Sequence, residues 1–249
     1  MSLRPPLRVA AMALLFIVCV PLFGLARLFG KSEFWVCFFL QQVGRVLGLR
    51  VTVLGQPVGT DVLYVANHLS WLDILALGGV RYTRFVAKSE IAGWPLIGWL
   101  AALGGSVFVH RGRRSATREQ ADAVAIALHD GWPVALFAEG GTSDGVALSP
   151  FRPALFAAAV QAGATVQPVA IDYGARAAEV AWPDGARFAA EIKRMLKRTG
   201  AVPVTLRYLS PLDAGEHNRK ALAARSEAAV ADALGVGNSR MKDGVIPAW

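Results

Sequence analysis

The segment Val65-Ala66-Asn67-His68-Leu69-Ser70-Trp71-Leu72-Asp73 joins two mainly apolar runs, residues 62–66 and residues 71–79. The first run has the length of a buried strand, and the second has the length of a short helix. Ser70 and Asp73 have the spacing of a capping box, in which Ser70 is the N-cap of the helix. The pattern predicts a strand, a turn that carries His68, and a helix whose first turn carries Asp73.

The separation of His68 and Asp73 determines what the pair can do. In one continuous helix the two side chains would not share a face, but across a turn the carboxylate can fold back onto a ring nitrogen. A carboxylate placed there orients the imidazole while the other ring nitrogen takes a proton from a hydroxyl. No nucleophilic side chain belongs to this pair, so we expect the hydroxyl to come from a substrate. The structural alternative is that Asp73 only caps the helix and His68 is a turn residue.

Strands and helices alternate after residue 50. Strands are predicted at residues 51–54, 62–66, 83–87, 106–110, 134–137, 165–171 and 202–208, and helices at residues 71–79, 96–103, 117–129, 154–161, 191–198 and 219–234. Such alternation predicts an α/β fold, with a single largely parallel sheet flanked by helices. We expect one catalytic domain at residues 51–249, preceded by an apolar helical membrane-binding segment at residues 1–50.

The N-terminal segment contains an uncharged stretch, residues 9–26. At about 1.5 Å per residue a helix there reaches about 27 Å, the margin for crossing a bilayer, and Pro21 would kink it. A second block at residues 34–49 is too short and too polar to cross. Three interpretations compete: a transmembrane anchor, a helical pair embedded in one leaflet, or a signal peptide cleaved after Gly24 or Ala26.

The composition favours a membrane partner. Hydrophobic residues make up 54% of the chain, the mean hydropathy is +0.42 and the net charge is +8. Residues 1–60 carry six basic residues against one acidic residue, which suits anionic lipids. No basic run alternates with stacking aromatics, so nucleic acid is not an expected partner. The two cysteines lack the spacing of a zinc site or a disulfide framework.

Asn67-His68-Leu69-Ser70-Trp71-Leu72-Asp73 resembles the first motif of the glycerolipid acyltransferases of the 1-acyl-glycerol-3-phosphate (lysophosphatidic acid) acyltransferase type. Three further blocks match that family in order, so the resemblance covers roughly residues 51–209. It implies a membrane-associated O-acyltransferase in which His68 removes the proton of a lysolipid hydroxyl as that oxygen attacks an acyl thioester. Acyl-CoA or acyl carrier protein is the expected donor, so the catalytic domain is expected at the inner membrane facing the cytoplasm. Neither a metal nor a bound cofactor is expected.

The second block is Gly104-Gly105-Ser106-Val107-Phe108-Val109-His110-Arg111. The resemblance implies that Arg111 binds the phosphate of the acceptor, and its place at the end of a predicted parallel strand agrees with this role. A guanidinium also matches the geometry of phosphate oxygens. Lys88 ends another predicted strand and resembles a lysine that the family places near the site.

The third block is Phe137-Ala138-Glu139-Gly140-Gly141-Thr142-Ser143. Glu139 is expected to bind the glycerol backbone or to hold Arg111. The backbone N–H groups of Gly140 and Gly141 are candidates for stabilising a tetrahedral oxyanion.

The third block departs from its family at one cationic position. Thr142 stands where the family usually has an arginine, and Arg152 lies where the family often has a lysine. Arg152 is therefore a candidate to supply the missing charge. The expected acceptor is 1-acyl-glycerol-3-phosphate, giving phosphatidate. The alternative is another lysolipid such as lyso-ornithine lipid, which needs no phosphate-binding arginine at this place.

Two rival functions remain. Ser143 lies in a G-x-S-x-G pattern, and Asp172 or Asp213 followed by His217 gives the chain order of an α/β-hydrolase. A nucleophile elbow runs from strand to helix without a break, whereas two prolines soon after this pattern oppose a helix, so a serine hydrolase is not expected. The other rival is a non-catalytic membrane-associated protein with the same fold.

Overall fold

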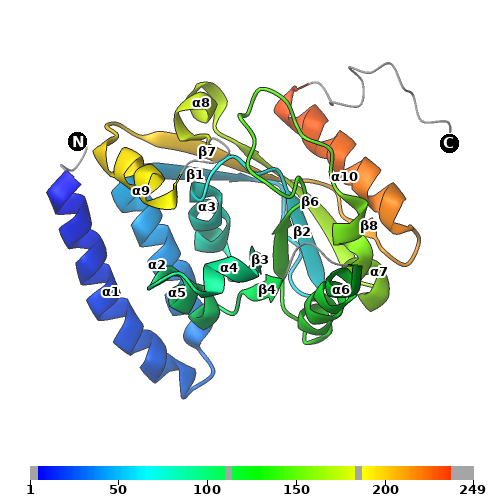
Figure 1. Ribbon diagram of the computed structural model, residues 1–249, viewed down its shortest axis with the longest axis horizontal. Coiled ribbons are helices and arrows are strands. Elements are labelled where there is room, and N and C mark those ends of the chain that lie inside the picture. Colours follow the sequence, from blue (N-terminus) through cyan, green and yellow to red (C-terminus); the bar gives the residue numbers. More distant parts are fainter. Residues whose placement is uncertain (1–4, 110–113, 183–186, 237–249) are drawn as a thin grey trace.

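A computed structural model describes residues 5–109, 114–182 and 187–236, except for the side chains of residues 114–120 (Figure 1). The described strands form one sheet in the order β1-β7-β6-β2-β5-β3-β4, with β8 paired to β6. Their bounds are β1 (Leu49–Leu54), β2 (Val62–Ala66), β3 (Arg84–Lys88), β4 (Val107–Val109), β5 (Val134–Phe137), β6 (Thr165–Asp172), β7 (Val202–Tyr208) and β8 (Leu212–Asp213).

The sheet is mainly parallel. Parallel pairing joins β1 to β7, β2 to both β5 and β6, and β3 to both β4 and β5. Antiparallel pairing joins β6 to β7 and to the short strand β8. The predicted α/β fold with a largely parallel sheet is confirmed.

Helices cover both faces of the sheet (Figure 1). They are α1 (Pro5–Arg27), α2 (Ser32–Leu47), α3 (Leu72–Val80), α4 (Ser89–Ala92), α5 (Ile97–Leu103), α6 (Arg114–His129), α7 (Ala157–Ala162), α8 (Ala177–Val180), α9 (Phe188–Lys197) and α10 (Arg219–Leu234), with 3₁₀ turns η1 (Pro153–Phe156) and η2 (Gly174–Arg176). The helix predicted at residues 154–161 is split, because Pro153 opens a 3₁₀ turn that passes into α7 only at Ala157. The short elements α4, α8, η2 and β8 were not predicted.

Strand β2 lies at the centre of the sheet and explains its two-sided core. All five of its residues are buried, as expected for a continuous apolar strand covered on both faces. Val62, Tyr64 and Ala66 pack in a cluster with residues of α2 and α3. Leu63 and Val65 point the other way, into a cluster with residues of α6, α7 and α10. This packing fixes β2, and with it the turn that begins at Asn67.

The N-terminal helices α1 and α2 form a hairpin on one flank of the α/β fold (Figure 1). Helix α2 packs along α3, and α1 packs along α2. Among the described helices, α1 alone is long and apolar enough to cross a membrane, with a mean hydropathy of 2.6 over its best window, of which 6% is buried. Pro21 lies inside α1, which runs unbroken from Pro5 to Arg27.

The first turns of α1 are attached to the domain by a buried arginine. Nη1 of Arg8 lies 3.0 Å from the carbonyl oxygens of Met195 and Leu196 and 2.6 Å from that of Arg198. These carbonyl groups belong to the last turn and C-cap of α9, where the backbone supplies few donors. The guanidinium of Arg8 therefore caps α9.

Candidate active site

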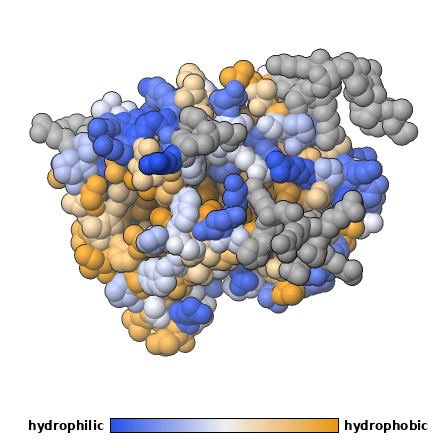
Figure 2. Space-filling view, viewed as in Figure 1, coloured by the Kyte–Doolittle hydropathy of each residue, from blue (hydrophilic) through white to orange (hydrophobic). Residues whose placement is uncertain are grey.

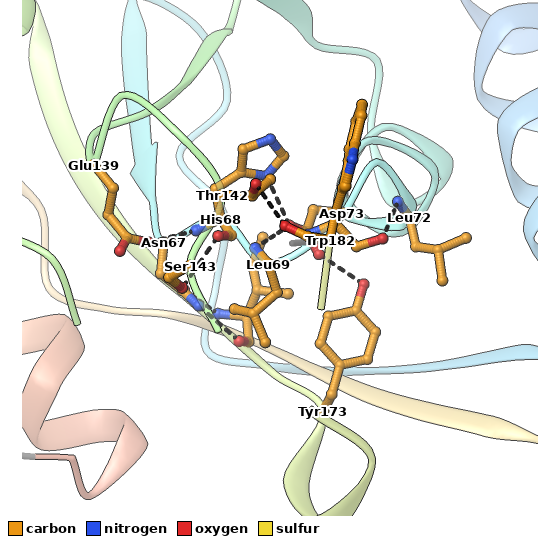
Figure 3. Close-up of polar contacts among 12 residues, drawn as sticks. Asn67, His68, Leu69, Leu72, Asp73, Glu139, Thr142, Ser143, Tyr173 and Trp182 are labelled. Atoms are coloured by element: carbon orange, nitrogen blue, oxygen red, sulfur yellow. Dashed lines mark hydrogen bonds and ion pairs between the residues drawn. The ribbon is translucent and has the colours of Figure 1, made fainter. Parts of the chain in front are cut away.

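His68 and Asp73 meet directly across the turn between β2 and α3 (Figure 3). Nδ1 of His68 lies 2.8 Å from Oδ2 of Asp73, and the aspartate is completely buried. Helix α3 begins at Leu72, one residue later than predicted, with Trp71 rather than Ser70 as its N-cap. Asp73 still reaches back as a capping-box carboxylate does, accepting the Ser70 N–H at 2.9 Å.

The donors around Asp73 define the tautomer of His68. Oδ2 also accepts the backbone N–H of Leu69 at 2.8 Å, so two amide protons already point at this oxygen. A carboxylate acts as an acceptor only, and Nδ1 must therefore carry the ring proton that it donates to Oδ2. This leaves Nε2 with a free lone pair, the form that a general base requires.

The ring of His68 is packed yet reachable. It stacks on Phe137 at a centroid distance of 3.8 Å and an interplanar angle of 9°. Its side chain keeps 16% of its surface exposed, while Asp73 keeps none. The pair thus has a buried end that fixes the ring and an accessible end that can meet a substrate.

Four further hydrogen bonds hold the turn that carries His68. The Asn67 amide exchanges two hydrogen bonds with the backbone of Ile171 on β6, at 2.8 and 3.0 Å. The His68 N–H donates to Oε1 of Glu139 at 2.7 Å, and the Ser143 N–H donates to the His68 carbonyl at 2.8 Å. Residues from β2, β6 and the loop after β5 therefore fix the backbone at His68.

Tyr173 is a member of the site that sequence reasoning missed. Its buried hydroxyl donates to Oδ1 of Asp73 at 2.7 Å (Figure 3). Burial, and then the negative charge of Asp73, raise the pKa of Tyr173 well above its usual value, so this hydroxyl stays protonated. The available signal was its position directly after β6, at the same sheet edge as His68.

Glu139 faces the backbone of the site. Oε1 accepts the His68 N–H, Oε2 accepts the Ser149 N–H at 2.9 Å, and the residue is 4% exposed. Burial raises the pKa of Glu139, and the two backbone donors partly oppose that shift. Both oxygens are engaged with main-chain donors, and binding of a substrate by Glu139 stays a prediction.

The two glycines after Glu139 differ. Gly140 has φ +79°, and its N–H donates to the Phe137 carbonyl at 3.1 Å, which makes it a poor candidate for an oxyanion donor. A Cβ on Gly140 would lie 2.6 Å from Nε of Arg152, so glycine lets this guanidinium lie against the loop. A Cβ on Gly141 would meet nothing within 4 Å, and its N–H stays the predicted donor.

Of the three cationic residues predicted for the site, the structure describes Arg152 and Lys88, and these two lie on different segments. Arg152 is exposed overall and lies beside Gly140, close to the loop that holds His68. Lys88 is exposed at the end of β3, where it pairs with Val109 of β4. Arg111 lies outside the described residues, so its phosphate-binding role stays a prediction.

Thr142 occupies the position of the missing arginine. Its hydroxyl donates to the Trp182 carbonyl at 2.9 Å, and the Trp182 N–H donates to the Leu69 carbonyl at 2.7 Å. Trp182 thereby ties the segment after α8 to both the first and the third motif. Thr142 has a structural partner here and adds no charge to the site.

The arrangement around Ser143 does not match a serine hydrolase. Its hydroxyl donates to the backbone carbonyl of His68 at 3.3 Å, not to the imidazole. His217 lies at the β8 end of the sheet, where Nδ1 contacts the Asp213 carbonyl at 3.1 Å. Asp172 pairs with Arg207. Within the described part of the chain, no group of three His, Cys, Asp or Glu side chains has the arrangement of a metal site.

Known proteins are similar to this chain in sequence and in fold. The family described as Acyltransferase matches residues 50–172. The lyso-ornithine lipid O-acyltransferase of Brucella abortus (strain 2308) is 40% identical over 208 residues, which cover 76% of this chain and 78% of that protein. The lyso-ornithine lipid O-acyltransferase of Rhodobacter capsulatus is 36% identical over 252 residues, covering 93% and 90%.

A second type of acyltransferase is also similar. The 1-acyl-sn-glycerol-3-phosphate acyltransferase of Neisseria gonorrhoeae is 42% identical over 142 residues, covering 55% of this chain and 56% of that protein. The crystal structure of the 1-acyl-sn-glycerophosphate (LPA) acyltransferase PlsC from Thermotoga maritima matches with a TM-score of 0.66 and 26% identity, covering 92% of this chain and 94% of that one.

The chain belongs to the PlsC-like acyltransferase family. It is an O-acyltransferase of lipid biosynthesis, and its family implies a lysolipid acceptor and an acyl donor. The family expected from the sequence is confirmed at this level. The two lyso-ornithine lipid O-acyltransferases align with more of the chain than the 1-acyl-sn-glycerol-3-phosphate acyltransferase does.

Proposed function

We propose that the protein transfers an acyl group from acyl-CoA or acyl carrier protein to the hydroxyl of lyso-ornithine lipid. Nε2 of His68 takes the hydroxyl proton as the oxygen attacks the thioester carbonyl. The tetrahedral intermediate then expels the thiolate, forming an ester, and the imidazolium returns the proton to the leaving sulfur. Asp73 keeps Nδ1 protonated and stabilises the imidazolium between these steps.

The observation that carries the choice of acceptor is the bond from Thr142 to the Trp182 carbonyl. A phosphate monoester carries nearly two negative charges, and its recognition favours more than one cationic side chain. At this position Thr142 replaces the arginine expected from the family, and its hydroxyl donates a hydrogen bond to the Trp182 carbonyl of the protein itself. An ornithine head group offers a single carboxylate beside an ammonium group, for which the guanidinium of Arg152 next to Gly140 is sufficient. The names and coverage of the relatives support the same choice.

Lysophosphatidate is the second candidate acceptor. The relative from Neisseria gonorrhoeae supports it, as does the resemblance of Arg111 to a phosphate-binding arginine. In this alternative Arg111 and Arg152, with Lys88, supply the cationic site. The same His68 and Asp73 would perform the transfer, so the two candidates differ in acceptor recognition and not in chemistry.

We also propose that residues 1–50 attach the catalytic domain, residues 51–249, to the cytoplasmic face of the inner membrane. Three large side chains are 63–79% exposed around the turn of the hairpin: Leu28, Phe29 and Phe34. Arg8 holds one end of α1 to α9, and α1 lies along α2, which lies on α3. Crossing the bilayer would pull these contacts apart, which supports a hairpin embedded in one leaflet over a transmembrane anchor or a cleaved signal peptide.

A defined acceptor panel tests the proposal. The purified full-length protein is assayed in mixed micelles with labelled acyl-CoA or acyl carrier protein, using lyso-ornithine lipid or lysophosphatidate. We expect kcat/KM to favour lyso-ornithine lipid by about tenfold or more, because a site that lacks a cationic partner discriminates against the doubly charged head group. A preference for lysophosphatidate would establish the second candidate, and no transfer to either would refute both.

A further inference from the structure

The corner between α4 and α5 is an apolar element within the catalytic domain. Residues 91–103 carry no charged side chain. Leu96 is 52% exposed and Trp99 is 47% exposed, and Pro95 between α4 and α5 is exposed as well. Helix α5 has only seven residues, so these side chains lie close together on the surface.

The backbone of the corner keeps Leu96 in an unusual conformation. Leu96 has φ +62°, which a residue with a Cβ adopts only at a cost. The neighbouring Gly98 allows α4 and α5 to approach closely, since a Cβ there would lie 2.3 Å from the Ala92 carbonyl oxygen. The tight corner thus holds the large apolar side chain of Leu96 outward in a strained backbone conformation. In water this exposure does not stabilise the isolated protein.

This apolar corner continues the surface of the N-terminal hairpin. Trp99 contacts Phe16 of α1 with ring centroids 6.0 Å apart. At the other end of α5, a Cβ on Gly104 would lie 3.8 Å from a methyl group of Val36 on α2. Figure 2 shows the apolar flank over α1 and α2, where exposed side chains include Leu14, Ile17, Val18, Leu25, Leu28 and Phe29.

We propose that the α4–α5 corner is a second membrane-contacting element, with Leu96 and Trp99 inserted in the same lipid leaflet as the α1–α2 hairpin. Lipid fits this surface better than a protein partner. The continuous patch is dominated by α1, whose hydropathy is that of a membrane helix, whereas protein interfaces are on average about as apolar as other surface. Exposed tryptophan and leucine side chains also match the composition of membrane-surface segments.

The corner also leads from this surface to the candidate active site. Trp94 contacts Phe188 at a centroid distance of 4.9 Å, and Phe188 contacts Trp71 at 5.9 Å. Trp71 is the N-cap of the helix that carries Asp73. A leaflet that contacts the corner would therefore lie beside a row of packed aromatic rings that ends at the helix carrying Asp73.

Vesicle binding tests this inference without depending on the acceptor. The full-length protein and the L96E/W99E variant are co-sedimented with vesicles of phosphatidylglycerol and phosphatidylcholine. We expect the variant to bind at least about tenfold more weakly, because burying one large apolar side chain is typically worth that factor. The matched control is Ile126→Glu on α6, a side chain that is 62% exposed on the other flank of the domain, and it should bind as the parent does. Trp99→Phe should retain binding.

A site-specific label provides the second measurement. With Cys19 and Cys37 replaced by serine, an environment-sensitive fluorophore is attached to Leu96→Cys or to Ile126→Cys. On addition of vesicles, the label at position 96 should brighten and shift to the blue, and the label at 126 should not. Unchanged fluorescence at position 96, or equal binding by L96E/W99E and the parent, would overturn the inference. It rests on the proposed membrane attachment, and failure of the parent itself to bind vesicles would overturn both.

Discussion

The hydroxyl of Tyr173 and the carboxylate of Asp73 form a hydrogen bond of 2.7 Å on the oxygen that does not touch His68. Asp73 therefore receives four donors: Tyr173 on Oδ1, and His68, Leu69 and Ser70 on Oδ2. Such a set of donors holds the carboxylate of Asp73 in one orientation. The orientation of His68 thus depends on a residue at the end of another strand, 100 positions along the chain from Asp73.

Tyr173→Phe should lower kcat by about ten- to a hundredfold, since a hydrogen bond to a charged group is typically worth about 1.5–3 kcal/mol. KM should change little, because the hydroxyl is directed at Asp73 and is buried. The steady-state kinetics of the variant are measured with and without Asp73→Asn. If Tyr173 acts through Asp73, its replacement adds almost nothing in the Asp73→Asn background. Equal losses in both backgrounds would assign Tyr173 a purely structural role.

His68→Ala should abolish acyl transfer while vesicle binding and thermal stability are retained. Asp73→Asn should reduce kcat by about four orders of magnitude, because an amide favours the wrong tautomer of the histidine. Ser143→Ala should keep nearly full activity, since its hydroxyl contacts only the His68 backbone carbonyl among the described residues. An active His68→Ala together with an inactive Ser143→Ala would contradict the proposed chemistry.

Thr142→Arg should raise kcat/KM for lysophosphatidate and lower it for lyso-ornithine lipid, because it adds a second cation to the site. Thr142→Val is the matched control, since it loses the bond to Trp182 without gaining charge.

Arg152→Ala should raise the KM of the acceptor by about tenfold or more, as expected for loss of a charge-assisted hydrogen bond. An unchanged KM in Arg152→Ala would exclude Arg152 from acceptor binding.

Glu139 should give the protein a pH-dependent stability. Because burial raises the pKa of Glu139, the folded state holds this proton more tightly than the unfolded chain does. The resulting stabilisation is present below the ordinary pKa of a carboxyl group and is lost as pH rises through the raised value. Thermal unfolding from pH 4 to pH 7.5 should therefore show the Tm of the parent falling relative to that of Glu139→Gln. Glu216→Gln, at an exposed residue, is the control, and a Tm difference independent of pH would contradict the assignment.

Arg8→Ala should destabilise the protein by about 1–3 kcal/mol, because it leaves one buried and two partly buried carbonyl groups at the end of α9 without their charged donor. Hydrogen exchange should increase in α9 more than in α10, which lies on the other side of the sheet. Arg8→Lys should recover part of the loss. Unchanged exchange in α9 would show that the cap contributes little.

The central part of the fold could be predicted from sequence because its signals are local. The bounds of β2, β5, β7 and α10 agree with the predicted residues, since each is a continuous apolar or periodic run with clear ends. The pairing of His68 and Asp73 was likewise predictable, because a turn of four intervening residues nearly determines the geometry.

The remaining members of the site depend on contacts that are distant in sequence. Tyr173 reaches Asp73 only because β6 lies beside β2, and no spacing rule indicates that neighbour. The engagement of Glu139 with the His68 N–H depends in the same way on the pairing of β2 with β5. Thr142 could be recognised as a departure from the family pattern, but its bond to Trp182 required the fold.

The cap that Arg8 provides for α9 sets a condition for making a water-soluble form of this enzyme. Deleting the apolar hairpin would remove the exposed apolar surface. It would also remove Arg8, the donor that caps α9. Polar replacements at the exposed positions of α1 and α2, with Arg8 and the α2–α3 contact retained, would reduce lipid affinity and keep that helix intact. The hairpin that we propose as the membrane attachment is therefore also a structural part of the fold, because its Arg8 caps α9.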